Sequence, residues 1–195
     1  MQKEAAIDND FVMHLAEIDN WSKEDHLNNV MTMFDELDVI PIMHELVYNK
    51  ELCGGPDTTC KNNALSFFDN DIINVKYLSE IIDNQSKRQY YEIVFKEIYY
   101  DFKGNLPSNI KDIFKDWKNK ASLGETHTVV MCFIMGCSIF LSDDDDSKKL
   151  SQVLKNKKSF KLDVYDRKKA CDRIKELGAG VLNKKDRRIL SHVPK

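Results

Sequence analysis

Residues 121–150 read ASLGETHTVVMCFIMGCSIFLSDDDDSKKL, and the fold and function expected of the chain depend on this stretch. Glu125 follows a glycine and opens an apolar run that ends at Gly136. A second apolar run, residues 138–141, leads into four consecutive aspartates. The spacing predicts a helix over residues 124–135, a strand over 138–142 and another helix over 146–155. Carboxylates therefore stand at the ends of buried elements, where they are costly unless a positive group joins them.

The composition is that of a globular protein. The chain has 195 residues, of which 42% are hydrophobic and 31% are charged, and we expect a single domain over residues 1–195. No apolar run approaches the ~20 residues of a membrane span, and the start, MQKEAAIDND, lacks the apolar stretch of a secretory signal. We therefore expect no membrane contact and a cytoplasmic location. The odd number of cysteines, five, argues against a disulfide framework.

The charges are distributed unevenly along the chain. Residues 1–154 carry 15 Lys and Arg against 27 Asp and Glu, whereas residues 155–195 carry 14 against 5. An acidic body with a basic end suits a metal site beside a surface that binds a polyanion. Two solvated faces of opposite charge are the alternative explanation.

Short strands alternate with helices along the chain, which predicts an α/β fold with a parallel sheet covered on both faces. The expected strands are residues 5–7, 72–75, 138–142 and 160–164. Pro41 is expected to start a helix that contains Glu45 and ends at the Gly54-Gly55-Pro56 sequence. Residues 54–71 read as a polar, turn-rich connection.

Acidic residues follow two of the expected strands. Asp8 ends the first strand, and Asp143 and Asp144 end the strand 138–142. Sites in open α/β sheets form outside the carboxyl ends of the strands, where Glu125 at its helix N-terminus and Glu45 could join them. Two unit charges ~4 Å apart repel by about 4 kcal/mol at an effective dielectric of 20. A hard cation relieves that repulsion, and oxygen ligands select Mg²⁺ or Mn²⁺.

Four segments in this order resemble the PIN domain, a nuclease fold found among toxin ribonucleases and RNA-processing enzymes. AAIDNDFVMHL resembles the family's first strand, its Asp-x-Asn/Asp pair (Asp8 and Asp10) and the helix that follows. PIMHELVYNKEL is similar to the second helix with its glutamate, here Glu45. LGETHTVVMCFIMGCSIF resembles the third motif with Glu125, and FLSDDDD resembles the final Thr/Ser-x-Asp-x-Asp, with Ser142, Asp144 and Asp146.

The resemblance implies a three-layer α/β/α sandwich with a short central parallel sheet, and a metal-dependent ribonuclease. Its catalytic metal ligands would be Asp8, Glu45, Glu125 and Asp144, and the motif favours Asp144 over its neighbour as the inward-facing residue. Ser142 would position water or a carboxylate. The additional metal-ligand candidates are Asp10, Asp143 and Asp146. The resemblance also suggests a toxin with an antitoxin partner, and a homodimer.

Each of these residues also has an ordinary explanation. Asp8 is a suitable helix cap, Glu125 suits any helix N-terminus, and the aspartate run suits a solvated turn. A basic cluster near the end of the chain would hold the RNA backbone or simply be a charged surface; its members are Lys184, Lys185, Arg187 and Arg188. The alternative functions are a decayed site that binds RNA or protein without cleaving it, and an unrelated α/β protein.

Overall fold

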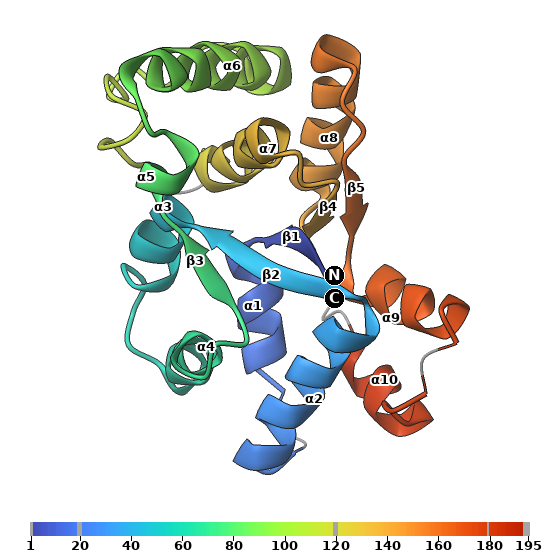
Figure 1. The fold of residues 1–195 in the computed structure, drawn as a ribbon. Coiled ribbons are helices and arrows are strands. Elements are labelled where there is room, and N and C mark those ends of the chain that lie inside the picture. The colour runs from blue at the N-terminus through green and yellow to red at the C-terminus, as the bar shows by residue number, and fades with distance from the viewer. Residues whose placement is uncertain (1, 19–20, 119–120, 179, 193–195) are drawn as a thin grey trace.

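Five short parallel strands form the centre of the molecule, in the order β3-β2-β1-β4-β5 (Figure 1). The computed structural model describes residues 2–18, 21–118, 121–178 and 180–192. The strands are β1 (Lys3–Ile7), β2 (Val39–His44), β3 (Asn74–Lys76), β4 (Ile139–Leu141) and β5 (Asp163–Tyr165). Helices cover both faces of this sheet, so the expected three-layer α/β/α architecture is confirmed (Figure 1).

The helices belong to two layers and to a segment at the edge of the sheet. One layer contains α1 (Asn9–Ala16), α2 (Lys23–Glu36), α4 (Thr59–Asp69), α9 (Arg167–Glu176) and α10 (Lys184–Leu190). The other layer contains α5 (Leu78–Ile81), α6 (Gln85–Lys103), α7 (Leu123–Met135) and α8 (Asp145–Lys158). The edge segment consists of α3 (Glu45–Val47) and the π-helical turn η1 (Tyr48–Leu52).

Alternation along β1 divides the core between the two layers. Ala5 and Ile7 pack into the core on the α1 side, whereas Ala6 packs into the core beneath α6 and α7. Successive side chains of a strand point to opposite faces, so the part of β1 that is covered on both faces needs apolar residues at every position. The sequence of β1 meets that need from Ala5 onward.

Polar side chains cap the starts of several helices. Ser22 accepts a hydrogen bond from the Asp25 amide, Asp166 accepts one from the Lys169 amide, and Asn183 caps α10. Such side-chain caps satisfy amides that have no partner within the helix.

The expected helix beginning at Pro41 is wrong. Pro41 lies inside β2, paired with Ala5 of β1, and the helix begins only at Glu45. Strand β3 pairs with β2 only from Ile42 onward, so at Pro41 the β3 side has no partner strand, and a missing amide hydrogen is tolerated there. The residues 54–71 expected to be a connection also contain α4, capped by Thr58.

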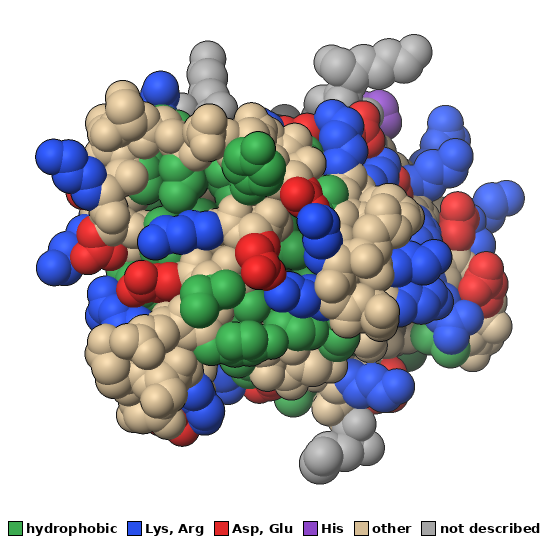
Figure 2. All heavy atoms as spheres, turned by 90° about the horizontal axis from the view of Figure 1, so that it is seen from above, with side chains coloured by type: hydrophobic (Ala, Val, Ile, Leu, Met, Phe, Trp, Pro, Cys, Tyr) green, Lys and Arg blue, Asp and Glu red, His purple; other side chains and the backbone are tan. Residues whose placement is uncertain are grey.

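Among the described residues, no helix is long and apolar enough to cross a membrane. Figure 2 shows the face over α6, where hydrophobic side chains lie among acidic and basic ones. The exposed large hydrophobic side chains of α6 are Tyr90, Ile93 and Tyr100.

Candidate active site

The order of the strands creates a crevice at the carboxyl ends of β1 and β4. These two strands are neighbours, with Ile7 beside Leu141, although they are far apart in the sequence. Helices that follow β1 and β4 lie on opposite faces of the sheet. The loop after β1 and the loop after β4 therefore separate and leave a crevice between them. Ligands bind in such crevices in open α/β sheets.

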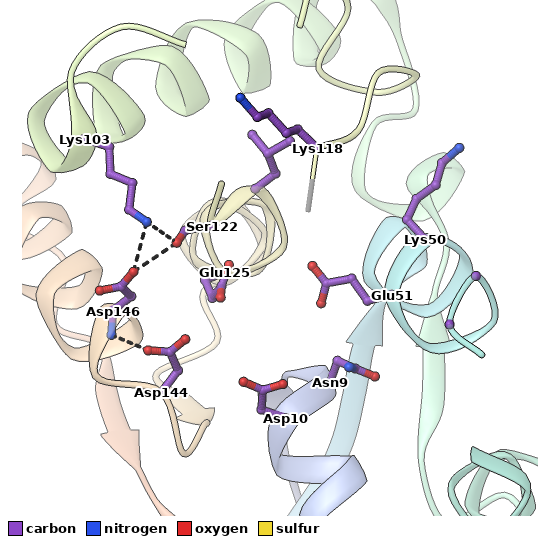
Figure 3. Close-up of a pocket in the computed structure, with 13 residues that line it drawn as sticks. Asn9, Asp10, Lys50, Glu51, Lys103, Lys118, Ser122, Glu125, Asp144 and Asp146 are labelled. Carbon is purple, nitrogen blue, oxygen red and sulfur yellow. Dashed lines mark hydrogen bonds and ion pairs between the residues drawn. The ribbon is translucent and has the colours of Figure 1, made fainter. Parts of the chain in front are cut away.

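An acidic pocket of ≈ 500 Å³ opens at this place. Carboxylates from four segments line it: Asp10 from α1, Glu51 from η1, Glu125 from α7, and Asp144 and Asp146 from the start of α8. In Figure 3 the carboxylates of Asp10, Glu51, Glu125 and Asp144 point toward one another across the pocket. The fold therefore gathers negative charge in one place from residues up to 136 positions apart in the sequence, Asp10 and Asp146.

Local helix geometry positions these side chains. Asp8 caps α1 by accepting a hydrogen bond from the Phe11 amide at 2.8 Å, which places Asp10 in the first turn. The amide of Cys53 donates to the carbonyl of Tyr48 at 2.8 Å, which closes the π-helical turn that carries Glu51. π-Helical turns are rare in proteins overall, but those that occur are often found at functional sites.

Gly124 allows Glu51 to lie against the start of α7. A Cβ atom on Gly124 would be 2.4 Å from Oε1 of Glu51, which is closer than such atoms approach. The carboxylate of Glu51 thus sits where any larger residue at position 124 would place its side chain. Its neighbour Glu125 projects from the same helical turn into the pocket.

Burial and mutual repulsion raise the pKa values of Glu51, Glu125 and Asp10. Burial, followed by repulsion from Glu125 and Asp10, raises the pKa of Glu51 to about 8. Burial, with repulsion from Asp144, Asp10 and Asp146, raises the pKa of Glu125 to about 7. The pKa of Asp10 is raised by burial and then by Asp144. A nearby cation would reverse these effects, because it favours the charged carboxylates.

Two oxygen atoms at the pocket have no hydrogen-bond partner among the described residues. They are Oε2 of Glu125 and Oδ1 of Asn9, and both are buried from solvent. Buried acceptors normally have a hydrogen-bond partner. A buried acceptor that lacks one in a native site indicates that an ion, a water or a ligand binds there. Glu125 is also the acid that opens the apolar run ending at Gly136 in the sequence.

Asp146 is in a different state from the other acids. Although burial opposes it, hydrogen bonds from Lys149, Lys103 and Ser122 lower the pKa of Asp146 to about 2. Asp146 thus carries its charge within a local network, drawn in Figure 3. Lys103 belongs to the pocket, together with Lys50 and Lys118, so the acidic floor has basic side chains around it.

Asp8 and Ser142 lie beneath the pocket, outside its lining. Asp8 is 4% exposed, and burial raises its pKa well above the usual range despite hydrogen bonds from Ser142 and the Phe11 amide. Glu125 is close enough to raise it further. Oγ of Ser142 lies 2.7 Å from Oγ of Ser147 and accepts a hydrogen bond from the amide of Asp144 at 3.1 Å, which fixes the loop that presents Asp144.

Glu45 and Asp143 do not line the pocket. Glu45 accepts a hydrogen bond from the Leu78 amide at 2.7 Å and joins α3 to α5. Asp143 forms a buried ion pair with Arg167 at 2.6 Å, and His14 lies 2.9 Å from the same oxygen. Both residues therefore have structural partners, and Glu51 supplies the pocket's carboxylate from the segment in which Glu45 was expected to do so.

The basic cluster of the last helix lies apart from the acidic pocket. Lys184, Arg187 and Arg188 line a second hollow with Lys175 and Ser191, and the two pockets share no residue. Lys185 is exposed on the same helix. Contact of this cluster with RNA stays a prediction.

The sequence interpretation missed Glu51, Asn9 and the three lysines of the pocket. Glu51 carries no local signal, because only the tertiary approach of its carboxylate to Gly124 brings it to the pocket. Lys50, Lys103 and Lys118 carry none, since isolated lysines occur on any surface.

Comparisons with known proteins add no support to the PIN-domain resemblance, which therefore rests on the sequence motifs alone. No protein-family model matches the chain, and no curated protein or solved structure is significantly similar to it. The expected PIN-domain membership therefore stays a prediction.

The donor set of the pocket suits a hard divalent cation only if water or other ligands complete its coordination. Within the described part of the chain, no three His, Cys, Asp or Glu side chains are placed to hold a metal ion by themselves. Mg²⁺ commonly uses one or two carboxylates and completes its six ligands with water and substrate phosphates. The unpartnered Oε2 of Glu125, with Glu51 and Asp10 nearby, suits that mode of binding.

Proposed function

We propose that this protein is a metal-dependent ribonuclease that hydrolyses phosphodiester bonds in the acidic pocket. The supporting observation is the buried, unpartnered Oε2 of Glu125 among carboxylates whose pKa values are raised by burial and by one another. A site of this charge is unfavourable for the metal-free protein and becomes favourable with Mg²⁺ or Mn²⁺. The lysines around the pocket suit a phosphate substrate.

Each pocket residue has a distinct task in this proposal. When bound, Mg²⁺ or Mn²⁺ supplies positive charge that activates water and stabilises the phosphate in the transition state. Glu125 and Glu51 hold the cation, and Asp10 and Asp144 complete the acidic wall around it. Ser142 fixes the loop of Asp144, and Asp8 fixes the first turn of α1.

RNA is the proposed substrate because of the motif resemblance, which also suggests the narrower role of a toxin. An antitoxin would then cover the acidic pocket, and a second copy of the chain would be a further partner. Such an enzyme would act in the cytoplasm, where its RNA substrates are.

Replacement of the pocket acids by amides tests the proposal. Glu125→Gln and Glu51→Gln should each lower RNA cleavage with Mn²⁺ on the order of 100-fold, since even an indirect metal partner is worth about 10–100-fold. Glu45→Gln is the matched control: it retains an acceptor for the Leu78 amide and lies outside the pocket, so cleavage should stay within about twofold.

The outcomes separate the alternatives. Wild-type protein that binds RNA without cleaving it, in both Mg²⁺ and Mn²⁺, would support a binding module instead. A folded Glu125→Gln variant with full cleavage activity would contradict the proposed site. Loss of activity in Glu45→Gln alone would return the metal site to the residues expected from the sequence.

A further inference from the structure

We propose that Lys103 is the residue of the acidic pocket that holds a phosphate group of the RNA substrate. This inference rests on the proposed ribonuclease function and assigns a substrate contact within it. Lys103 is the last residue of α6 and lies across the pocket from Glu51 (Figure 3). The sequence gives no sign of this role, because the residue belongs to no motif.

Lys103 differs from the other two lysines of the pocket in being fixed in position. Its ammonium group donates to Oγ of Ser122 at 2.6 Å and lies 3.1 Å from Oδ2 of Asp146. Lys50 and Lys118 are exposed and form no ion pair with any described residue. A cation held in place before the substrate arrives stabilises a phosphate better than one that must first be ordered.

The contacts of Lys103 leave part of its donor capacity for a ligand. An ammonium group has three hydrogens, and Ser122 and Asp146 engage two of them. Its side chain is 33% exposed and lines the pocket; its ammonium group also lies 5.1 Å from the centre of the Phe102 ring, and no hydrogen bond to a described residue takes the third hydrogen. Lysine ammonium groups commonly donate hydrogen bonds to phosphate oxygens, so a phosphate oxygen is the expected acceptor for this donor.

Asp146 serves as the anchor of Lys103 and is not itself free for a metal. One of its oxygens accepts from Ser122 at 3.0 Å and pairs with Lys103, and the other accepts from Lys149 at 2.9 Å. Glu125, by contrast, has an oxygen without a partner. The pocket thus has a metal side around Glu125 and a phosphate side at Lys103.

Lys149 provides a matched control for the test. Lys103 and Lys149 both pair with Asp146, but only Lys103 lines the pocket, while Lys149 approaches from α8 outside it. Lys103→Met and Lys149→Met each remove one cation from Asp146 and keep a long side chain. Only the first removes the proposed phosphate contact, and Lys103→Arg retains the charge.

The measurement is the binding of a fluorescent single-stranded oligoribonucleotide in Ca²⁺, as a function of salt, with a gel showing that the RNA stays intact. Each phosphate contact contributes about 0.7 to the slope of log affinity against log salt for single strands. Lys103→Met should therefore lower the slope by about 0.7, and Lys149→Met and Lys103→Arg should leave it near the wild-type value.

Each outcome decides the proposal. Equal losses in Lys103→Met and Lys149→Met would show that the effect passes through Asp146, and would overturn the phosphate contact. An unchanged salt slope in Lys103→Met would also overturn the phosphate contact. If the wild-type protein still cleaves RNA, the ribonuclease proposal stays intact in that case. A wild-type protein that neither binds nor cleaves RNA would overturn both.

Discussion

At the scale of single residues, the contact between Gly124 and Glu51 predicts a specific effect on metal binding. Gly124→Ala should weaken Mn²⁺ binding about tenfold, comparable to the loss of an indirect metal partner, because the new methyl group occupies the place of the Glu51 carboxylate. The helix itself should gain up to about 1 kcal/mol, since alanine is the better helix former.

Manganese binding is measured by electron paramagnetic resonance, and thermal unfolding shows that the variant is folded. Gly180→Ala is the control, because a Cβ there meets nothing within 4 Å. Equal manganese affinity in Gly124→Ala and the wild type would show that Glu51 is not a ligand.

Two aspartates of the same run, Asp143 and Asp145, should differ sharply in their effect on stability. Asp143 and its partner Arg167 have side chains only 2% exposed, so Asp143→Asn leaves a buried positive charge and should cost about 3–5 kcal/mol of unfolding free energy. Asp145 is 81% exposed, and Asp145→Asn should change stability by less than about 0.5 kcal/mol. Urea unfolding measures both variants, and equal values would contradict the structural role of Asp143.

The four aspartates also show what sequence can and cannot predict about the site. The apolar run before them places them at the end of β4, and that placement follows from periodicity alone. Which one enters the pocket depends on Arg167 and Lys103, whose approach is a matter of tertiary packing. The sequence therefore predicts acids at this edge of the sheet, and the structure assigns a partner to each.

At the scale of elements, a buried chain of hydrogen bonds joins β2, α6 and α7 behind the pocket. The Tyr91 hydroxyl lies 3.0 Å from Nε2 of His44 and 2.9 Å from Nδ1 of His127, and Nε2 of His127 lies 2.9 Å from the Ile113 carbonyl. The Leu46 amide donates to Nδ1 of His44, so one consistent direction of donation runs through two neutral imidazoles.

Removal of the central hydroxyl should leave one ring nitrogen of each imidazole, Nε2 of His44 and Nδ1 of His127, without its partner. Tyr91→Phe should therefore cost about 1–3 kcal/mol of unfolding free energy. Tyr90→Phe is its matched control, since the preceding tyrosine is 48% exposed and its change should stay within about 0.5 kcal/mol. Chemical denaturation compares them, and a Tyr91→Phe protein as stable as the control would show that the network contributes little.

The elements that sequence predicts well are those whose pattern and caps agree. Helix α6 has a clear apolar stripe, a capping Asn84 at its start and Gly104 at its end, so its local sequence agrees with its structure. Strand β2 was missed because Pro41 and the short helix after it mimic a helix start, and only the partial pairing with β3 makes the proline acceptable. The local sequence signals at Pro41 favour a helix, but the pairing of β2 with its neighbouring strands makes this segment a strand.

At the scale of the whole molecule, the buried acids and buried histidines should give the metal-free protein opposite dependences on pH. Glu51 and Glu125 have pKa values of about 8 and about 7, above the ordinary 4.5. The folded protein therefore holds protons that the unfolded chain releases, and the free energy of unfolding falls as pH rises from 4.5 to 8. His44 and His127 have lowered pKa values, so below 6.5 the unfolded chain binds more protons and stability falls as pH drops.

Above the ordinary histidine pKa of 6.5, the acids alone set the trend. In EDTA, the melting temperature at pH 8 should therefore lie below that at pH 7, and Glu51→Gln should remove a large part of the difference by raising the pH 8 value by about 4–8 °C, as about 2 kcal/mol shifts a chain of this length. Glu45→Gln, outside the pocket, should keep the full wild-type decline. Manganese should raise the wild-type value at pH 8 more than that of Glu51→Gln, because the cation replaces the protons that the acids lose. The melting temperature of Glu51→Gln could instead decline with pH as much as that of the wild type. Repulsion between the pocket acids would then not limit stability, and it could not be the reason that the site attracts a cation.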